Sequence, residues 1–261
     1  MSIFQDINFT NFGHKPDGFS AKDKLFSNSH LAGATLVEDV DLTKWFPPVF
    51  SQENIGSCVA NSTVGAIMAQ MAHKQNVDPS KIEMLSRLFV YWCARDLETP
   101  PDTDVDAGTR IRLAFNSLNI LGVCSEKTYI YDVLNVNIRP TILAFREAVA
   151  NTISAYYRID ATGDDRLVQV KQALSSGCPI VFGTALSDSY RNVNDDTVIQ
   201  PPTDNFIGNH AQIIVAWSNS KQAFKIRNSW GANWGISGYC WMSPDYIKAD
   251  ITEDLWVATL A

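Results

Sequence analysis

The spacing of apolar residues changes once along the chain, from a helical period before Gly177 to an alternating, strand-like period after it. Before Gly177, apolar side chains recur every three or four residues in five segments that we predict to be helices: 57–74, 79–92, 109–121, 140–149 and 167–174. The residues at the helix ends support these limits, because Ser57 can cap the first helix, Pro79 suits the first turn of the second, and Gly122 can end the third.

After Gly177, short aromatic and β-branched segments separated by turn residues are predicted to be strands: 179–186, 211–217, 222–227, 238–243 and 255–259. Helices followed by antiparallel strands are typical of an α+β protein. We expect three parts, which are an N-terminal arm or strap over residues 1–40, a helical lobe over residues 41–155 and a β lobe over residues 156–261. A cleft between two such lobes is a natural ligand site.

Composition and charge exclude several classes of protein. The 261 residues are 46% hydrophobic, which is enough for a sizeable core and argues against intrinsic disorder. The 21 Lys and Arg against 28 Asp and Glu give a net charge of −7 without a basic stripe, so we expect no nucleic-acid partner. No apolar run reaches the roughly 18–20 residues that a bilayer requires, and the N-terminus lacks the basic and apolar regions of a signal peptide. We therefore expect no membrane partner and a cytoplasmic location.

Metal and disulfide chemistry are not expected either. The five cysteines are scattered along the chain without a Cys-x-x-Cys pair, which fits neither a disulfide framework nor a zinc site. Asp102–Asp106 resembles the start of a calcium-binding loop, but Ala107 and Leu113 stand where that loop needs Gly and Glu. We interpret this segment as a solvated acidic loop and expect no metal or organic cofactor.

His210 is the candidate for a catalytic base. The other histidines lie in irregular or helix-end positions and are interpreted as structural: His14, His30 and His73. A three-residue turn at 218–220 would pair Trp217 with Lys221, so that paired positions sum to 438. At that register His210 faces Asn228, whose amide could orient one ring nitrogen. A slip by one residue would put the two side chains on opposite faces, and an ordinary hairpin with polar ends would show the same pattern.

Cys58 is the candidate nucleophile, because it opens a predicted helix whose free N–H groups and positive dipole end favour a thiolate. The remaining cysteines are interpreted as small buried hydrophobic residues: Cys93, Cys124, Cys178 and Cys240. Gly56 would let the backbone approach a substrate closely. Gln52, six residues upstream, could hold a tetrahedral oxyanion together with the Cys58 N–H, and losing one such donor typically costs about 100- to 1000-fold in rate.

Three separated motifs in this order resemble the papain-like cysteine peptidases. They are Gln-Glu-Asn-Ile-Gly-Ser-Cys at 52–58, Asn-His-Ala at 209–211 and Asn-Ser-Trp-Gly at 228–231, with Trp-Gly at 234–235 and Gly-Tyr at 238–239. The spacing of 152 residues between Cys58 and His210 is close to that of the family. Further stretches resemble the intracellular, bacterial and viral-type members, and they extend the resemblance over nearly the whole chain: 12–17 with Asp23, 47–49, 85–89, 108–112, 122–124 and 179–183.

The resemblance implies a two-lobe α+β fold, with a helical N-terminal lobe, an antiparallel, β-barrel-like C-terminal lobe and the active site in the cleft between them. It also implies the roles of the site residues: Cys58 as nucleophile, His210 as general base and acid, Asn228 as the group that holds the imidazole, Gln52 as an oxyanion donor, Trp230 as a shield for the Asn–His hydrogen bond, and Gly56 and Gly108 as supporting residues for substrate binding. A thiolate–imidazolium pair would result, so we predict that the pKa of Cys58 is depressed.

The sequence also departs from the family pattern. Ile55 stands where the family often has a disulfide-bonded Cys, and Val59 replaces the usual Trp after the nucleophile. The arm is shorter than a typical inhibitory prosegment, so we interpret it as an integral strap across the lobes.

The expected function is hydrolysis of peptide bonds in a polypeptide substrate through a covalent acyl-enzyme. Two alternatives stay open. One is a structural component of a larger assembly such as a virion, joined through the arm and with little or no activity. The other is a peptidoglycan or isopeptide hydrolase that uses the same site.

Overall fold

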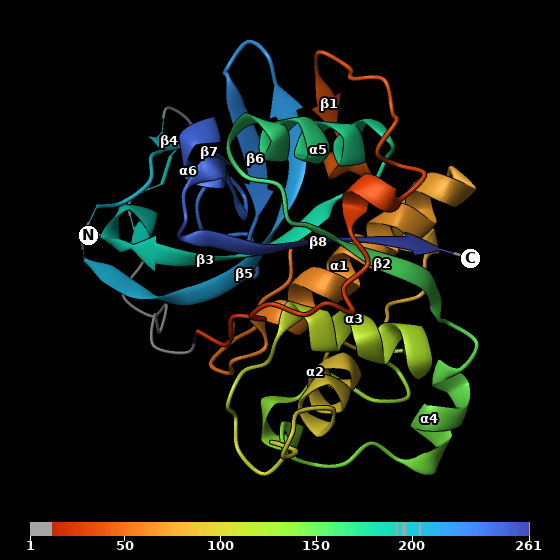
Figure 1. The fold of residues 1–261 in the computed structure, drawn as a ribbon. Helices are drawn as coiled ribbons and strands as arrows, with labels where there is room; N and C mark the ends of the chain where they lie inside the picture. Colours follow the sequence, from red (N-terminus) through yellow and green to blue (C-terminus); the bar gives the residue numbers. More distant parts are fainter. Residues whose placement is uncertain (1–11, 192, 195–196, 204, 261) are drawn as a thin grey trace.

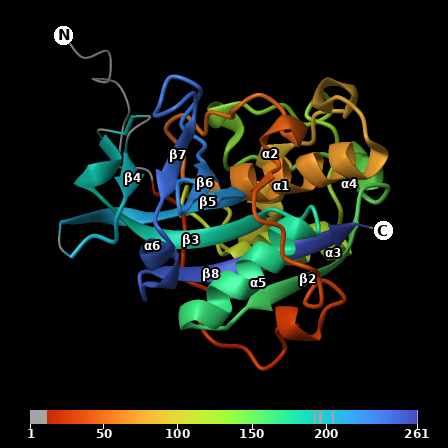
Figure 2. The same cartoon turned by 90° about the horizontal axis from the view of Figure 1, so that it is seen from above.

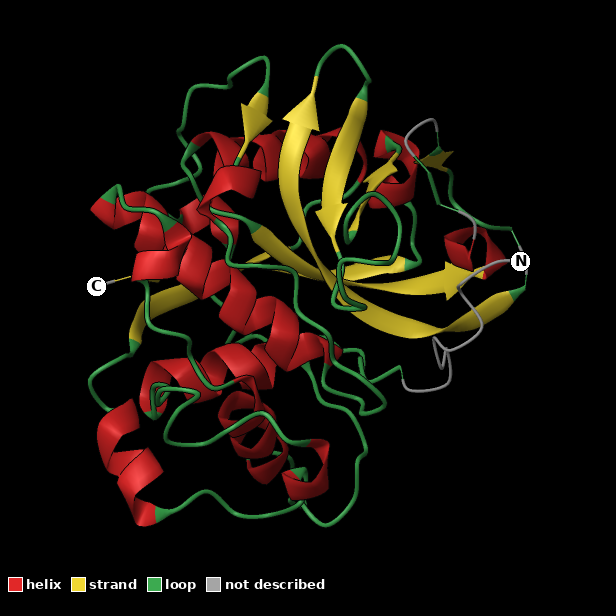
Figure 3. Cartoon of the chain, turned by 180° about the vertical axis from the view of Figure 1, so that it is seen from behind, coloured by secondary structure: helices red, strands yellow, loops and turns green. Residues whose placement is uncertain are grey.

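The computed structural model describes residues 12–260 except 192, 195–196 and 204. Helices α1 to α4 gather on one side of a large sheet, where α1 packs against β5 and α3 packs against β2 (Figures 1 and 3). The helices have these bounds: α1 Cys58–Gln75, α2 Arg87–Asp96, α3 Ile111–Ile120, α4 Ile142–Ala148, α5 Gly163–Ser175 and α6 Pro244–Lys248. The α+β class and the five predicted helical regions are confirmed.

The start of the second helix was predicted wrongly. Pro79–Lys81 forms a short 3-10 turn capped by Asp78, and α2 begins only after Ser86, whose hydroxyl accepts the N–H of Phe89 at 3.1 Å. Between the two, Leu85 forms an antiparallel bridge with Ser125. This long-range pairing keeps the segment extended, although its apolar spacing is helical.

The sheet contains eight strands with these bounds: β1 Val40–Asp41, β2 Ile153–Ile159, β3 Ile180–Ser187, β4 Val198–Ile199, β5 Phe206–Ser218, β6 Ala223–Arg227, β7 Tyr239–Met242 and β8 Thr252–Leu260. Their order is β2-β8-β3-β5-β6-β7-β4, with β1 paired to β5, and α5 and α6 lie next to each other over the sheet (Figure 2). Neighbouring strands are antiparallel except for β4 and β7, which are parallel.

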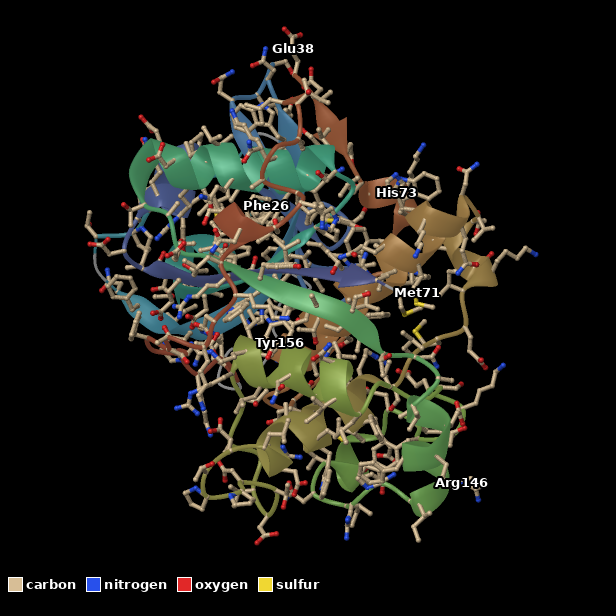
Figure 4. The ribbon with its side chains drawn as sticks, turned by 45° about the vertical axis from the view of Figure 1, so that its right-hand side comes forward. Phe26, Glu38, Met71, His73, Arg146 and Tyr156 are labelled. Atoms are coloured by element: carbon tan, nitrogen blue, oxygen red, sulfur yellow. The ribbon has the colours of Figure 1, made fainter. Side chains whose placement is uncertain are left out.

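The expectation of a barrel-like lobe was wrong, because the described strands form an open path that ends at β2 and β4. Instead of closing the sheet, β2 packs against the helical side, where Tyr156 stacks on Phe115 of α3 with ring centroids 6.1 Å apart (Figure 4). The strand begins at Ile153 and so crosses the predicted limit between residues 155 and 156. The three-part division itself stays a prediction.

The arm crosses the boundary between the helices and the sheet (Figure 1). His14 forms a parallel bridge with Thr109 just before α3, and Leu25 forms one with Arg158 of β2. Further along, Phe26 is fully buried in the core (Figure 4). The described part of the segment before residue 41 therefore packs against both the helices and the sheet, and we refer to it as the strap.

Buried ion pairs and a buried hydrogen bond hold this strap in place. Asp23 receives Arg112 Nε at 2.8 Å and Arg158 Nη1 at 3.2 Å, and Arg158 also binds Asp254 at 2.8 Å. Asp17 accepts the indole N–H of Trp256 at 2.7 Å. These contacts join the arm to α3, β2 and β8.

Within the described part of the chain, no helix has the length and apolar character needed to cross a bilayer.

Gly122→Ala is expected to destabilise the fold more than Gly163→Ala, although both glycines have a left-handed backbone with φ of +78° and +56°. A β-carbon costs roughly 1–2 kcal/mol of backbone strain at either position. At Gly122 it would also lie 2.0 Å from the Ala148 carbonyl oxygen, whereas at Gly163 no described heavy atom lies within 4 Å. Urea denaturation followed by circular dichroism measures both free energies of unfolding. Equal losses would contradict the close packing of Gly122 against the end of α4.

Candidate active site

Cys58 is the first residue of α1, and its side chain is fully buried. Ser57 precedes the helix but makes no side-chain cap, and its hydroxyl lies 2.6 Å from that of Tyr131 instead. The Ile55 carbonyl fixes the turn, because it accepts the Ser57 N–H at 2.9 Å and the side-chain amide of Gln52 at 3.1 Å. The candidate nucleophile therefore lies at a helix N-terminus on a tightly hydrogen-bonded loop.

His210 lies on β5, fully buried, with Nε2 2.8 Å from Asn228 Oδ1. The same Asn228 oxygen accepts the Ser229 N–H at 2.7 Å, so it acts as an acceptor and the proton of the neutral imidazole lies on Nε2. Nδ1 has no hydrogen-bond partner among the described residues. The N–H of Ala211, the residue after His210, hydrogen-bonds the Cys58 sulfur. The fold thus brings all three candidate residues to one place.

The register predicted for the β5–β6 hairpin was wrong, although the His–Asn contact that it predicted is present. Trp217 pairs with Phe224, and after an irregularity between Ile214 and Ala216 the paired positions sum to 440 rather than 438. A difference of two residues keeps side chains on the same face of a sheet. His210 and Asn228 are therefore diagonal neighbours, a separation that side chains of this length can bridge.

Gln52 is joined to this group through Ser229. The Ser229 hydroxyl donates to Gln52 Oε1 at 2.8 Å, and the Gln52 N–H donates to the Ser229 carbonyl at 2.8 Å. Because Oε1 is held in this way, the amide nitrogen of Gln52 is directed towards the turn before Cys58. Ser229 was not singled out in the sequence, but its place directly after Asn228 is the signal that could have revealed this role.

Trp230 packs against the imidazole of His210, with ring centroids 4.8 Å apart and an interplanar angle of 32°. Phe12 of the arm covers the same imidazole edge-on at 6.0 Å and approaches Trp230 at 6.3 Å. The Asn228–His210 hydrogen bond therefore lies in a water-poor, aromatic environment, to which the arm contributes one of the rings.

Gly13 of the arm lies directly against the candidate nucleophile. Its N–H hydrogen-bonds the Cys58 sulfur, and its carbonyl accepts the Thr109 N–H at 2.8 Å. A β-carbon on Gly13 would lie 1.7 Å from the Gly56 carbonyl oxygen, and one on Gly108 would lie 2.3 Å from the Gly13 oxygen. The close approach therefore requires glycine at positions 13 and 108, while Thr109 supplies the backbone N–H that holds the arm.

The depressed pKa predicted for Cys58 is contradicted. Burial raises the pKa of the thiol to about 11, although N–H groups of Ala211, Gly13 and Val59 lower it in part. Burial likewise lowers the pKa of His210 to about 4, against the opposite effect of its hydrogen bond to Asn228. Near neutral pH both groups are uncharged in this structure, because the arm excludes the water that an ion pair would need.

The other four cysteines are buried free thiols, as expected. Burial raises the pKa of Cys178 to about 11 and that of Cys124 to about 12. Across the described ranges, no three His, Cys, Asp or Glu side chains are grouped so as to hold a metal ion.

The interpretation of 102–106 as a solvated acidic loop agrees with its exposure, since Asp104 and Asp106 are exposed and Asp102 is half-buried, but two of its carboxylates also bind distant segments. Asp102 receives the ammonium group of Lys15 at 2.8 Å. Asp106 accepts the N–H of Gly56 at 3.0 Å and the hydroxyl of Tyr91 at 2.5 Å. Both contacts join segments far apart in the sequence, and the acidic spacing of the loop gives no sign of them.

Gly13→Ala is expected to displace the arm, because its new β-carbon cannot coexist with the Gly56 carbonyl 1.7 Å away. The rate of Cys58 alkylation by iodoacetamide should rise at least about tenfold. A tenfold rise corresponds to about 1.4 kcal/mol in the equilibrium between the bound and the displaced arm. Gly33→Ala is the matched control, since no described heavy atom lies within 4 Å of that position. Equal alkylation rates in the two variants, measured by mass spectrometry of the Cys58 peptide, would contradict the occluding role of Gly13.

The pH dependence of Cys58 alkylation should also differ between the unsubstituted chain and Gly13→Ala. In the unsubstituted chain the rate is expected to keep rising towards pH 11, because burial raises the pKa of Cys58 to about 11. In Gly13→Ala the midpoint should fall below about 8.5, the ordinary value for a thiol, since the exposed sulfur regains the helix terminus and His210. A shared midpoint in both proteins would show that the arm does not set the ionisation of Cys58.

Comparison with known proteins shows the family to which this chain belongs. The model of the papain family cysteine proteases matches residues 36–259. An uncharacterized peptidase C1-like protein of Acanthamoeba polyphaga mimivirus is 34% identical over 215 residues, which are 79% of this chain and 68% of that protein. The viral cathepsin of Choristoneura fumiferana nuclear polyhedrosis virus is 28% identical over 196 residues, covering 73% of this chain and 54% of its own length.

Among solved structures, xylellain, a cysteine protease from Xylella fastidiosa, has a TM-score of 0.81 at 30% identity and covers 97% of both chains. Procathepsin B S9 from Trypanosoma congolense has a TM-score of 0.76 at 16% identity over 98% of this chain and 88% of its own, a likeness of fold alone. The expected resemblance to viral and bacterial members is confirmed by the mimivirus protein and xylellain. The family model and the mimivirus relative together show that this chain belongs to the papain family of cysteine proteases.

Proposed function

We propose that this chain cleaves peptide bonds with Cys58 as nucleophile, His210 as general base and acid, and Asn228 and Gln52 as supporting groups. The observation that carries the proposal is the position of the arm, which is itself a polypeptide backbone lying against the sulfur. Its Gly13 N–H hydrogen-bonds Cys58, and Thr109 holds its carbonyl. A site that accommodates one polypeptide backbone in this way suits a polypeptide substrate.

In the proposed reaction, the Cys58 sulfur forms a bond to the carbonyl carbon of the substrate while its proton passes to His210 Nδ1. The Cys58 N–H and the Gln52 amide stabilise the oxyanion. Collapse breaks the C–N bond, and His210 returns the proton to the leaving amine. Water, deprotonated by His210, then attacks the thioester, releasing the acid and the free thiol. Asn228 keeps Nε2 occupied, so that Nδ1 faces the reacting atoms.

The arm has to move before this chemistry can start. Cys58 and His210 are both 0% exposed beneath Phe12 and Gly13, and both are uncharged there. Displacement of these two residues would admit water and substrate together and restore conditions in which the thiolate–imidazolium pair is favoured. In this proposal the structure represents a latent form, and the active form would differ from it at Phe12 and Gly13.

Two alternatives expected from the sequence remain outcomes of the test. The mimivirus, viral and bacterial relatives are peptidases by name, which favours peptide hydrolysis over a purely structural role or a peptidoglycan or isopeptide substrate. A cytoplasmic location and association with a virion also stay predictions. An assembly component would show no turnover when the arm is displaced, and an isopeptide hydrolase would cleave side-chain-linked but not main-chain peptides.

Hydrolysis of a fluorogenic peptide library by the Gly13→Ala protein tests the proposal. Cys58→Ala should abolish turnover, whereas Cys178→Ala should leave it within about twofold, since that thiol is buried and protonated. Gln52→Ala should lower kcat by about 100- to 1000-fold, as expected for an oxyanion donor. A burst of released amine, equal to the enzyme concentration, should reveal the acyl-enzyme. Turnover that survives Cys58→Ala would refute the assignment.

A further inference from the structure

We propose that Asp106 and Tyr91 are positioning residues that couple the oxyanion side of the active site to the backbone edge that holds a bound polypeptide. This inference rests on the proposed function. Four groups form one chain of hydrogen bonds between these regions: the Gly56 N–H, the Asp106 carboxylate, the Tyr91 hydroxyl and the Gly108 N–H. The sequence separates them by up to 52 residues, from Gly56 to Gly108.

The first end of the chain is the peptide bond between Ile55 and Gly56. Its N–H donates to both oxygens of Asp106 at 3.0 Å, and its carbonyl accepts the side-chain amide of Gln52 at 3.1 Å. One peptide plane is therefore held on one side by Asp106 and holds Gln52 on the other. A rotation of this peptide plane would therefore move the Gln52 amide. It would also disturb the chain just before Cys58, whose N–H is the second proposed donor to the oxyanion.

The second end is the backbone just before α3. Tyr91 on α2 is fully buried, and its hydroxyl donates to Asp106 at 2.5 Å while accepting the Gly108 N–H at 2.9 Å. The next N–H along the chain, that of Thr109, donates to the Gly13 carbonyl at 2.8 Å. Tyr91 therefore orients the backbone at Gly108, and this orientation directs the next N–H, that of Thr109, at the bound backbone of the arm.

The direction of each hydrogen bond is fixed by the chemistry of the groups. A carboxylate only accepts, so the Gly56 N–H and the Tyr91 hydroxyl must both donate to Asp106. Burial, with the nearby charge of Asp106, raises the pKa of Tyr91, which keeps its hydroxyl proton available for this bond. The family often places a disulfide-bonded Cys at the position of Ile55, whereas in this chain a charge-assisted hydrogen-bond chain ties the same loop.

Two readouts test this coupling. In the full chain, Asp106→Ala should speed amide hydrogen exchange in two separate segments, 52–58 and 107–110, and Tyr91→Phe should do the same. Asp104→Asn is the matched control, because it removes a carboxylate from an exposed residue of the same loop. In the Gly13→Ala background, where arm displacement no longer limits the rate, Asp106→Ala should lower kcat about 10- to 100-fold, as expected for a small misplacement of catalytic groups. Asp106→Asn, which keeps one acceptor, should recover part of that loss.

A double-mutant cycle decides whether Asp106 acts through Gln52. Once Gln52→Ala is present, adding Asp106→Ala should change kcat by less than about threefold, because the group that Asp106 positions is gone. Fully multiplicative losses in kcat, or faster exchange in only one of the two segments, would overturn the coupling. If the Gly13→Ala parent cleaves no peptide, the proposed function fails and the exchange result alone decides the coupling. Should Asp106→Ala not fold, Tyr91→Phe and Asp106→Asn provide the same comparison.

Discussion

The backbone of Gly13 lies against those of Gly56 and Gly108, so closely that a β-carbon on Gly13 would lie 1.7 Å from the Gly56 oxygen and one on Gly108 would lie 2.3 Å from the Gly13 oxygen. The covered state of the candidate active site depends on this contact of the arm. It places a polypeptide N–H at the Cys58 sulfur and a carbonyl at Thr109, and it brings Phe12 onto His210. Buried ion pairs of Asp23 and Asp254 with arginines hold the rest of the strap against α3, β2 and β8, so the seal is part of the fold.

The burial beneath the arm also decides the charge of Cys58 and His210. A helix N-terminus favours a thiolate by roughly 0.3–1 kcal/mol, and by up to about 2 kcal/mol in a partly buried setting. The rise of the Cys58 pKa to about 11 corresponds to roughly 3 kcal/mol in the opposite direction. Burial therefore outweighs the helix terminus, and His210 is affected in the matching sense, with its pKa lowered to about 4. The proposed latency is therefore electrostatic as well as steric, since Phe12 and Gly13 exclude solvent from Cys58 and His210 and leave both groups uncharged.

Predictions from the sequence succeeded where neighbouring residues determine the local structure. They failed where a partner far away in the sequence determines it. The end of α3 before Gly122 follows from a helix-end residue, and the contact of His210 with Asn228 follows from alternation along a hairpin. The start of α1 lies next to the predicted Ser57, although Ser57 makes no side-chain cap. The helical spacing after Pro79 was overridden by the bridge of Leu85 with Ser125, and β2 was missed because its partner β8 lies at the other end of the chain. The prediction of a depressed Cys58 pKa failed for the same reason, because full burial of the thiol in the folded chain outweighs the N–H groups that lower its pKa, and burial cannot be judged from the residues around position 58.

Nitrogen NMR of the histidine side chains measures the central claim, that the arm keeps the catalytic pair buried and uncharged. With the arm in place, the His210 imidazole should carry its proton on Nε2, hydrogen-bonded to Asn228, and remain neutral until the pH falls to about 4. An imidazolium signal from His210 at pH 6 to 7 in the intact chain would contradict this claim, because the thiolate–imidazolium pair would then already exist beneath the arm.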